Sequence, residues 1–490
     1  MKRFFTRRRL AALMVLAAML LAGAAAFAVY LFGHSGWSMA APAHDRHAGD
    51  ARYELDITPY YDEGALLVRQ SVYFTNGDTA LDRLVFSLPL NAYRRSTTAP
   101  LDADAYNAAF EQGYAPGGIE FTSLTLDGNE VEWGVSGTRE ALLTLLCDIA
   151  PGQSVRVDME YHALLPEFSG AGGFDDAEWR MSGFCPLLGR VQDGTWTAYA
   201  PAYVGQYLYA PVSDFDITLH AISDYSVMTG GSAVVSEAEG GWNTWRIQLC
   251  DARSPAIVMR RGGHVYQRDV NGVSLRVYSR DRLQARRMLD EAASMLNALN
   301  ELYEYPYPAL DIVLGEYEGQ DASEAGLILA DTRAPDLSAR VCYLMARQIW
   351  GGIADCDPVE EPWLSEALAQ YSALRAAGRA GLNCCAAMRR DIDASLSITM
   401  PGGLNVESQA SAFTSQNDYD NVLRYRGAAV LELLSEASEG ALDEALPILA
   451  QEHAYDFITR EELLNALSQV DGGDWSAWLA ETLQGIGRAG

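Results

Sequence analysis

Residues 342–371 constrain the fold of this chain more than any other stretch. The stretch opens inside an apolar run, residues 341–350, whose composition predicts a helix that the glycine pair beginning at Gly351 brings to a stop. After a short acidic loop, Pro362 begins a second helix at a position where its missing N–H costs nothing. The second helix carries Glu366 within the segment W-L-S-E. We therefore expect two short helices with one carboxylate facing back from the second to the first.

Arg347 and Glu366 have eighteen residues between them, and the first is followed by Gln348 and then by Trp350-Gly351. This spacing and these flanks resemble the M1 aminopeptidases, which are gluzincin zinc peptidases with the motif H-E-x-x-H, then eighteen residues, then E within W-L-x-E. The resemblance covers about residues 52–485. It implies a multidomain α+β fold: an N-terminal antiparallel β-sandwich-like domain, a thermolysin-like α/β domain and a C-terminal helical segment.

The chemistry of the family motif is missing. The frame places Tyr343 at the first histidine, Leu344 at the catalytic glutamate and Arg347 at the second histidine, and Glu366 alone remains. Zinc takes neutral or anionic donors, its general base is a carboxylate, and arginine cannot release its proton to become a ligand. None of the seven histidines lies in an H-E-x-x-H motif. We expect no catalytic residue, no metal ligand and no cofactor.

Two further family motifs are altered as well. The loop after residues 310–314 resembles G-x-M-E-N, which binds the free amino terminus of the substrate in the family. Counting back from Gly326 puts Ser323 at the glutamate of that motif, whereas a deletion of one residue puts Glu324 there. The sequence leaves both assignments open, and the resemblance implies that Glu324 and Gly326 contact substrate.

Residues 421–431 resemble Y-x-K-G-A, whose tyrosine stabilises the oxyanion in the family. The offset from Gly427 falls on Arg424, with Tyr425 one position later and facing elsewhere on a helix. We therefore expect Arg424 to mark another degenerate catalytic position and Tyr425 to be a candidate substrate-binding residue.

A replaced histidine opposite a retained glutamate also predicts a contact. A carboxylate left in a low-dielectric cleft without a metal is costly unless it is paired. Arg347 can meet Glu366 with two parallel hydrogen bonds, and Tyr343 lies one helical turn earlier on the same face. We expect a buried Arg347–Glu366 ion pair with Tyr343 beside it.

The first 33 residues predict a membrane anchor. Residues 10–33 contain no charge and follow a basic cluster, and 24 such residues can span a bilayer. The positive-inside rule keeps residues 1–9 in the cytoplasm and exports the rest. We expect an uncleaved signal anchor and a single-pass membrane protein, with a cleavable signal processed near residues 40–43 as the alternative.

Composition and periodicity divide the exported part. Residues 34–50 form a polar linker, 51–270 alternate as strands between glycine-containing turns, 271–380 form the gluzincin-like domain, and 381–490 are helical. Helical spacing begins at residues 282–302. The seven cysteines are too few and too scattered to be a disulfide framework, so we expect mostly buried thiols. A net charge of −29 argues against nucleic acid as a partner.

Three functions remain after these observations. We favour a catalytically inactive pseudopeptidase that binds a peptide or protein, because two metal ligands, the base and the oxyanion tyrosine are all replaced. The second is an active hydrolase of metallopeptidase or glycosidase type with non-standard residues, since paired carboxylates cleave glycosides. The third is a structural subunit of a membrane complex, with residues 10–33 as the contact. The carboxylates for the second function are Asp355, Asp357, Glu360, Glu361 and Glu366.

Overall fold

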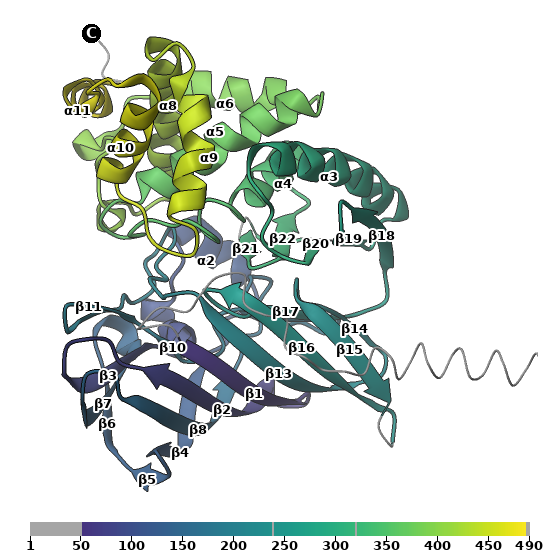
Figure 1. Cartoon of the computed structure of the whole chain (residues 1–490). Coiled ribbons are helices and arrows are strands. Elements are labelled where there is room, and N and C mark those ends of the chain that lie inside the picture. The colour runs from purple at the N-terminus through teal and green to yellow at the C-terminus, as the bar shows by residue number, and fades with distance from the viewer. Residues whose placement is uncertain (1–50, 238–239, 319–320, 487–490) are drawn as a thin grey trace, which may run out of the picture. The chain divides into compact units, whose positions relative to one another are not determined.

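The computed structural model describes residues 51–237, 240–318 and 321–486 (Figure 1). Sheets make up most of the N-terminal half of this part, and the C-terminal half has one five-stranded sheet followed mainly by helices, which confirms the expected mixed α+β fold. The predicted anchor at residues 10–33 and the linker at 34–50 lie outside the described residues. Across the described ranges, no helix combines the length and the apolar character that a membrane crossing requires.

An eight-stranded sheet forms the larger part of the N-terminal half (Figure 1). Strand β1 shows why: Tyr53, Leu55 and Ile57 are buried while the residues between them are less so, the period-two pattern of a half-buried strand. Its pairing with β2 is antiparallel and that with β13 is parallel. In sheet order the strands are β15 (Ser232–Glu237), β16 (Trp242–Ala252), β13 (Ser213–Ile222), β1 (Ala51–Tyr60), β2 (Ala65–Thr75), β8 (Ser154–Leu164), β4 (Gly118–Leu126) and β5 (Asn129–Glu130).

Three smaller sheets accompany it. Buried side chains of the large sheet and of the four-stranded sheet belong to one hydrophobic cluster, and the Gln70 side chain of β2 donates to the Pro186 carbonyl at 2.9 Å. The four-stranded sheet has β10 (Leu187–Leu188), β3 (Leu81–Ser87), β7 (Leu142–Ile149) and β6 (Glu132–Ser136). The others are β11 (Arg190–Gln192) with β12 (Thr195–Thr197), and β14 (Tyr225–Met228) with β17 (Ile257–Arg261) and β9 (Glu178–Met181). Short helical turns and α2 (Ala103–Ala109) connect the strands.

A five-stranded sheet begins the C-terminal half, in the order β18 (His264–Val270), β19 (Val273–Ser279), β20 (Ala309–Gly315), β22 (Leu327–Asp331) and β21 (Ala322–Glu324). Because β18 pairs with β19 along its whole length, the chain enters this sheet at His264. Strand β18 lies before the predicted domain boundary at residue 270 and belongs to this five-stranded sheet. The boundary itself stays a prediction.

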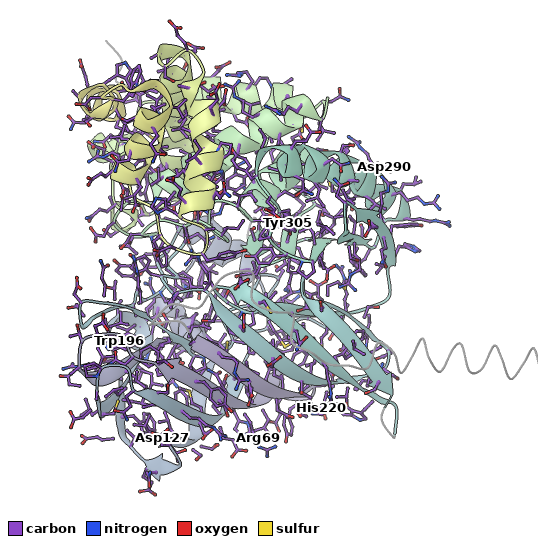
Figure 2. The ribbon with its side chains drawn as sticks, viewed as in Figure 1. Arg69, Asp127, Trp196, His220, Asp290 and Tyr305 are labelled. Atoms are coloured by element: carbon purple, nitrogen blue, oxygen red, sulfur yellow. The ribbon has the colours of Figure 1, made fainter. Side chains whose placement is uncertain are left out.

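Helix α3 (Arg282–Leu302) has the predicted bounds, and the Asp281 side chain caps it by accepting hydrogen bonds from two backbone N–H groups. Its buried side includes Met288 and Leu296, whereas Asp290 lies on the exposed side (Figure 2). The remaining α-helices are α4 (Leu337–Ala346), α5 (Trp363–Arg379), α6 (Cys385–Ser397), α7 (Gln416–Tyr419), α8 (Gly427–Ala437), α9 (Ala441–Glu452), α10 (Arg460–Asp471) and α11 (Ser476–Gly485).

Candidate functional site

Helices α4 and α5 position the site. Helix α4 begins at Leu337, where the Asp336 side chain accepts a hydrogen bond from a backbone N–H, and it ends at Ala346. The helix predicted over residues 341–350 therefore begins and ends four residues too late. After Ala346 the backbone tightens, with the Ile349 N–H bonded to the Ala346 carbonyl at 3.0 Å. Arg347 thus caps the helix instead of lying inside it, and Gly351 turns the chain at φ +141°. Helix α5 begins after Pro362 as expected.

The Glu366 carboxylate is the centre of the site. It accepts a hydrogen bond from the Tyr343 hydroxyl on one oxygen, and Arg347 Nη1 lies 3.4 Å from the other. The Arg347 and Glu366 side chains are 7% and 5% exposed, so the predicted buried ion pair is confirmed. Its geometry differs from the prediction of two parallel hydrogen bonds, because the tyrosine occupies the second carboxylate oxygen.

Both tyrosines at this carboxylate keep their protons. Burial and the Glu366 charge raise the pKa of Tyr343 and of Tyr419, so each hydroxyl is a donor at neutral pH. The Tyr419 hydroxyl lies 3.5 Å from the same oxygen that Arg347 contacts. Burial lowers the pKa of Arg347 and the Glu366 charge raises it, and the net result is an increase. Three donors therefore surround one carboxylate.

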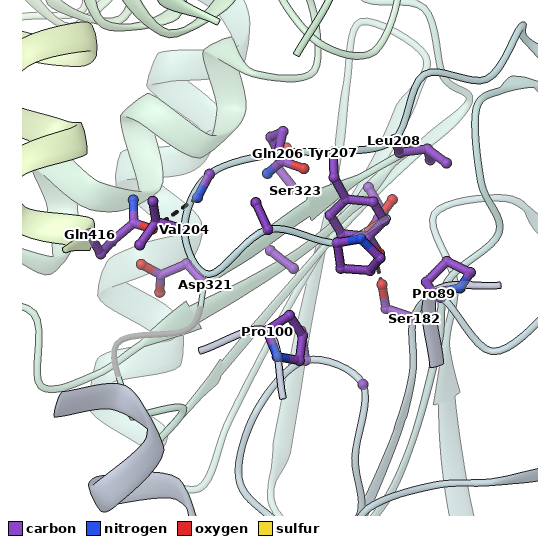
Figure 3. A pocket seen from close by; sticks show the side chains of 18 of the residues that line it. Pro89, Pro100, Ser182, Val204, Gln206, Tyr207, Leu208, Asp321, Ser323 and Gln416 are labelled. Atoms are coloured by element: carbon purple, nitrogen blue, oxygen red, sulfur yellow. Dashed lines mark hydrogen bonds between the residues drawn. The ribbon is translucent and has the colours of Figure 1, made fainter. Parts of the chain in front are cut away.

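A cavity of about 290 Å³ opens beside this cluster (Figure 3). Its wall combines strand β21, helices α4 and α5, residues 416–420 and the loop 201–208 of the N-terminal half. Its charged lining residues are five carboxylates and two guanidinium groups, which favours a cationic ligand. They are Asp102, Asp321, Glu324, Glu366, Asp420, Arg340 and Arg347.

Glu324, on strand β21, is another acidic residue that lines the cavity. Ser182, labelled in Figure 3, and Ser254 donate to its two oxygens at 2.9 and 2.5 Å. Burial raises the pKa of this carboxyl, against the two serine hydrogen bonds and the Arg347 charge, which lower it. A carboxyl with a raised pKa in a cleft is a common mark of a functional site.

The neighbouring Ser323 also lines the cavity, but its hydroxyl donates to the Leu344 carbonyl at 2.9 Å and accepts from Gln348 at 2.6 Å. Of the two alternatives that the sequence left open, Glu324 is the one that brings a carboxylate to the cavity. Gly326 serves packing: at φ +67° its backbone lies against Gly230, where a side chain would clash. Its N–H donates to Gln348 at 2.8 Å.

Replacing Glu324 by glutamine is expected to stabilise the fold at neutral pH. Because the folded-state pKa is raised above its ordinary value of 4.5, the wild type is most stable below that value and loses this stability as pH rises through the folded pKa. Glu324→Gln has no such loss, so its advantage in unfolding free energy should be present at pH 7 and vanish near pH 4. Denaturant unfolding across this range tests it, with exposed Asp290→Asn as control; an equal or larger advantage at pH 4 would contradict the assignment.

Tyr419 is a site residue that the sequence analysis missed. It is 1% exposed and ends α7, immediately before a π-helix over residues 420–426. The family offset counted from Gly427 cannot reach it, since it lies eight residues before that glycine. Gly205 of the overlying loop packs on its ring at φ +76° and donates from its N–H to Gln416 at 3.2 Å (Figure 3).

Arg424 and Tyr425, the two positions predicted from the offset to Gly427, are not among the described residues that line the cavity. The Arg424 guanidinium lies 3.5 Å above the Tyr343 ring centroid and donates to Gln370 at 2.7 Å, behind the residues that face the cavity. Tyr425 is half-buried beside it, 4.8 Å from the same guanidinium. Leu344 does line the cavity and carries no proton acceptor in its side chain.

The acidic loop before α5 does not assemble a second set of carboxylates at the cavity. Asp355 accepts from the Ser365 hydroxyl at 2.7 Å, and Asp357 accepts from the Tyr199 hydroxyl at 2.8 Å. Glu360 accepts from Gln409, and Glu361 accepts from the Arg460 N–H at 3.3 Å. Among the described residues, Glu366 is the one of these five carboxylates that lines the cavity.

The residues present do not fit a zinc ion. A catalytic zinc needs three protein donors, and here a phenol that keeps its proton and a guanidinium stand beside the single carboxylate. Within residues 51–237, 240–318 and 321–486, no three His, Cys, Asp or Glu side chains are grouped so as to hold a metal.

Comparisons with known proteins show the fold. No protein-family model matches the sequence, and no curated protein matches it. Among solved structures, the M1 zinc metallopeptidase of Deinococcus radiodurans is similar at 18% identity and a TM-score of 0.60, over 89% of this chain and 94% of that one. The glutamate-to-alanine mutant of that enzyme is similar at a TM-score of 0.61 and 17% identity, again over 89% of this chain and 94% of that one. The same mutant bound to a Tyr-Ser-Ala substrate is similar at a TM-score of 0.60 and 18% identity, over 90% of this chain and 94% of that one. The chain therefore has the fold of the M1 zinc metallopeptidases.

Proposed function

We propose that the chain is an M1-like pseudopeptidase, which retains the substrate cavity of the fold and binds a peptide or a protein segment without cleaving it. The observation that carries this proposal is the Glu366 carboxylate with donors from Tyr343, Arg347 and Tyr419. Each of these donors satisfies a lone pair that a metal would need. Loss of the metal site is thus accompanied by a cluster that stabilises the remaining carboxylate.

The ligand class follows from the cavity. Its carboxylates outnumber its guanidinium groups, and Glu324 lies on one wall with its oxygens held by two serine hydroxyls. A protonated amino group of a peptide would find an acceptor there. Similar M1 zinc metallopeptidase structures hold a Tyr-Ser-Ala substrate and L-arginine, and both of these molecules carry such a group.

The finer architecture and the location are part of the same proposal. Strands β18–β22 with α3–α5 would form the thermolysin-like domain, and the sheets before them a β-sandwich-like domain. Residues 10–33 would anchor the chain in the membrane, with the cavity in the extracytoplasmic part. The charge of −29 supports partners other than nucleic acid.

Detergent-purified full-length chain tests the proposal with two assays on one sample. Aminoacyl chromogenic substrates and Tyr-Ser-Ala should show no turnover above a heat-treated control, with and without added zinc. Calorimetry with Tyr-Ser-Ala should show binding that N-acetylation of the peptide abolishes. Glu324→Gln should weaken binding about tenfold or more, because the amino group loses a charged hydrogen-bond acceptor.

Asp290→Asn is the matched control, since this carboxylate is on α3 and its side chain is 69% exposed. Turnover that Glu324→Gln abolishes would favour an active hydrolase instead. Absence of binding to free and acetylated peptides alike would remove the cavity as a peptide site and favour a structural subunit.

A further inference from the structure

Two cysteine thiols meet in the core beside the site. Cys342 lies on α4, immediately before Tyr343, and Cys384 lies at the N-terminal end of α6. Their sulfur atoms are 3.8 Å apart, although the residues are 42 positions apart in the sequence. Cys342 and Cys384 are buried, with 3% and 4% of each residue exposed. Packing of α4 against α6 therefore holds the two thiols in hydrogen-bonding contact, and neither forms a disulfide.

We propose that Cys342 and Cys384 are a thiol-oxidation site, which a disulfide-bearing oxidant converts into a disulfide that links α4 to α6. This inference does not rest on the proposed function. A sulfur–sulfur contact needs closure to about 2.05 Å, which small side-chain rotations can supply when the sulfurs already touch. Vicinal Cys384 and Cys385, by contrast, would close a strained ring.

The chemistry balances with a disulfide RS–SR as the oxidant. A hydrogen bond with the Cys342 thiol lowers the pKa of Cys384, so Cys384 supplies the attacking thiolate. Its sulfur bonds to one sulfur of the oxidant, and the other leaves as RS⁻ and takes up a proton. Cys342 then gives up its proton and attacks the Cys384 sulfur, which releases the second RSH. The two thiols lose two electrons, and the oxidant gains them.

The link would act on the site through α4. The same helix carries Tyr343 and is capped by Arg347, the two residues that contact Glu366 from this side. A disulfide one residue before Tyr343 would restrict movement of this helix end relative to α6. The unfolded chain would also lose freedom by closing a loop of about forty residues, which favours the folded state.

Cys385 gives an internal reference for the experiment. It is half-buried and lines a separate cavity of about 570 Å³ with Arg375, Arg379 and Arg389. A small oxidant or alkylating reagent can reach this cavity from solvent. Labelling of Cys385 therefore reports access to this cavity, while a peptide that joins Cys342 to Cys384 reports the disulfide.

Full-length chain purified with reductant, then treated with oxidised glutathione, is quenched by alkylation, digested and read by mass spectrometry. The expected product joins the peptides of Cys342 and Cys384 and leaves Cys385 free to alkylate. The melting temperature should rise by roughly 5 °C and return on reduction. Cys385→Ser should leave the linked peptide unchanged, and Cys342→Ser should abolish it.

Two results would overturn the proposal. The first is complete alkylation of Cys342 and Cys384 when the oxidised protein is unfolded and then digested, and the second is a disulfide of Cys385 as the main product. Both are read on the wild type, so a variant that fails to fold does not remove the test.

Discussion

Arg347→Met is expected to lower the free energy of unfolding by roughly 3–5 kcal/mol, because it leaves the Glu366 carboxylate buried without its positive partner. The Glu366 side chain is 5% exposed, so water cannot replace the lost charge. Tyr343 and Tyr419 still donate to it, but neither hydroxyl neutralises a full negative charge. Denaturant unfolding of the two proteins at pH 7 measures the effect.

A double substitution distinguishes the effect of the lost ion pair from the effect of changing the side chain at position 347. Arg347→Met with Glu366→Leu removes both charges, so it should recover most of the loss, since an apolar pair of similar volume often replaces a buried ion pair without penalty. Arg287→Met is the exposed control: its pair with Glu291 lies on α3, the Arg287 side chain is 77% exposed, and surface pairs contribute about 0–1 kcal/mol. A loss for Arg347→Met as small as that of the control would contradict the buried-pair account.

The sequence predicts those features of the site that depend on local periodicity and on one fixed spacing. Residues 343 and 347 share a helix face, and the W-L-S-E segment begins the next helix, so the contact with Glu366 follows from the order of the residues along the chain. The bounds of α3 follow in the same way from its apolar spacing and its aspartate cap.

The sequence does not predict the contacts of the site that depend on packing between residues far apart in the chain. Tyr419 reaches Glu366 from α7, 53 positions along the chain, and the π-helix after it changes the register that any offset from Gly427 assumes. The loop 201–208 comes from the N-terminal half, and its closeness to the site depends on how Gly205 packs on the Tyr419 ring. Neither contact has a signature in sequence spacing.

Rebuilding the family motif is expected to create a zinc site beside Glu366, where the wild-type side chains Tyr343 and Arg347 do not fit the metal. The variant carries Tyr343→His, Leu344→Glu and Arg347→His. Positions 343 and 347 both contact the Glu366 carboxylate, so two imidazoles there would face the same point, and Glu366 would be the third donor. Elemental analysis of chelator-treated, zinc-dialysed protein should give about one zinc per chain for this variant and close to none for the wild type.

Two further sets of variants test this expectation: the single substitution Arg347→His, and removal of the Arg424 guanidinium from the triple variant. Arg347→His alone should bind no stoichiometric zinc, because residue 343 remains a phenol whose raised pKa keeps its proton. Arg424 lies 3.5 Å above the ring of residue 343 and would repel a divalent cation placed there. Adding Arg424→Met to the triple variant should therefore tighten zinc binding, whereas Arg389→Met, on α6 with its own partner Glu432, should not. Stoichiometric zinc in the wild type, or equal zinc affinity with and without Arg424, would show that the donors and charges of this site are wrongly assigned.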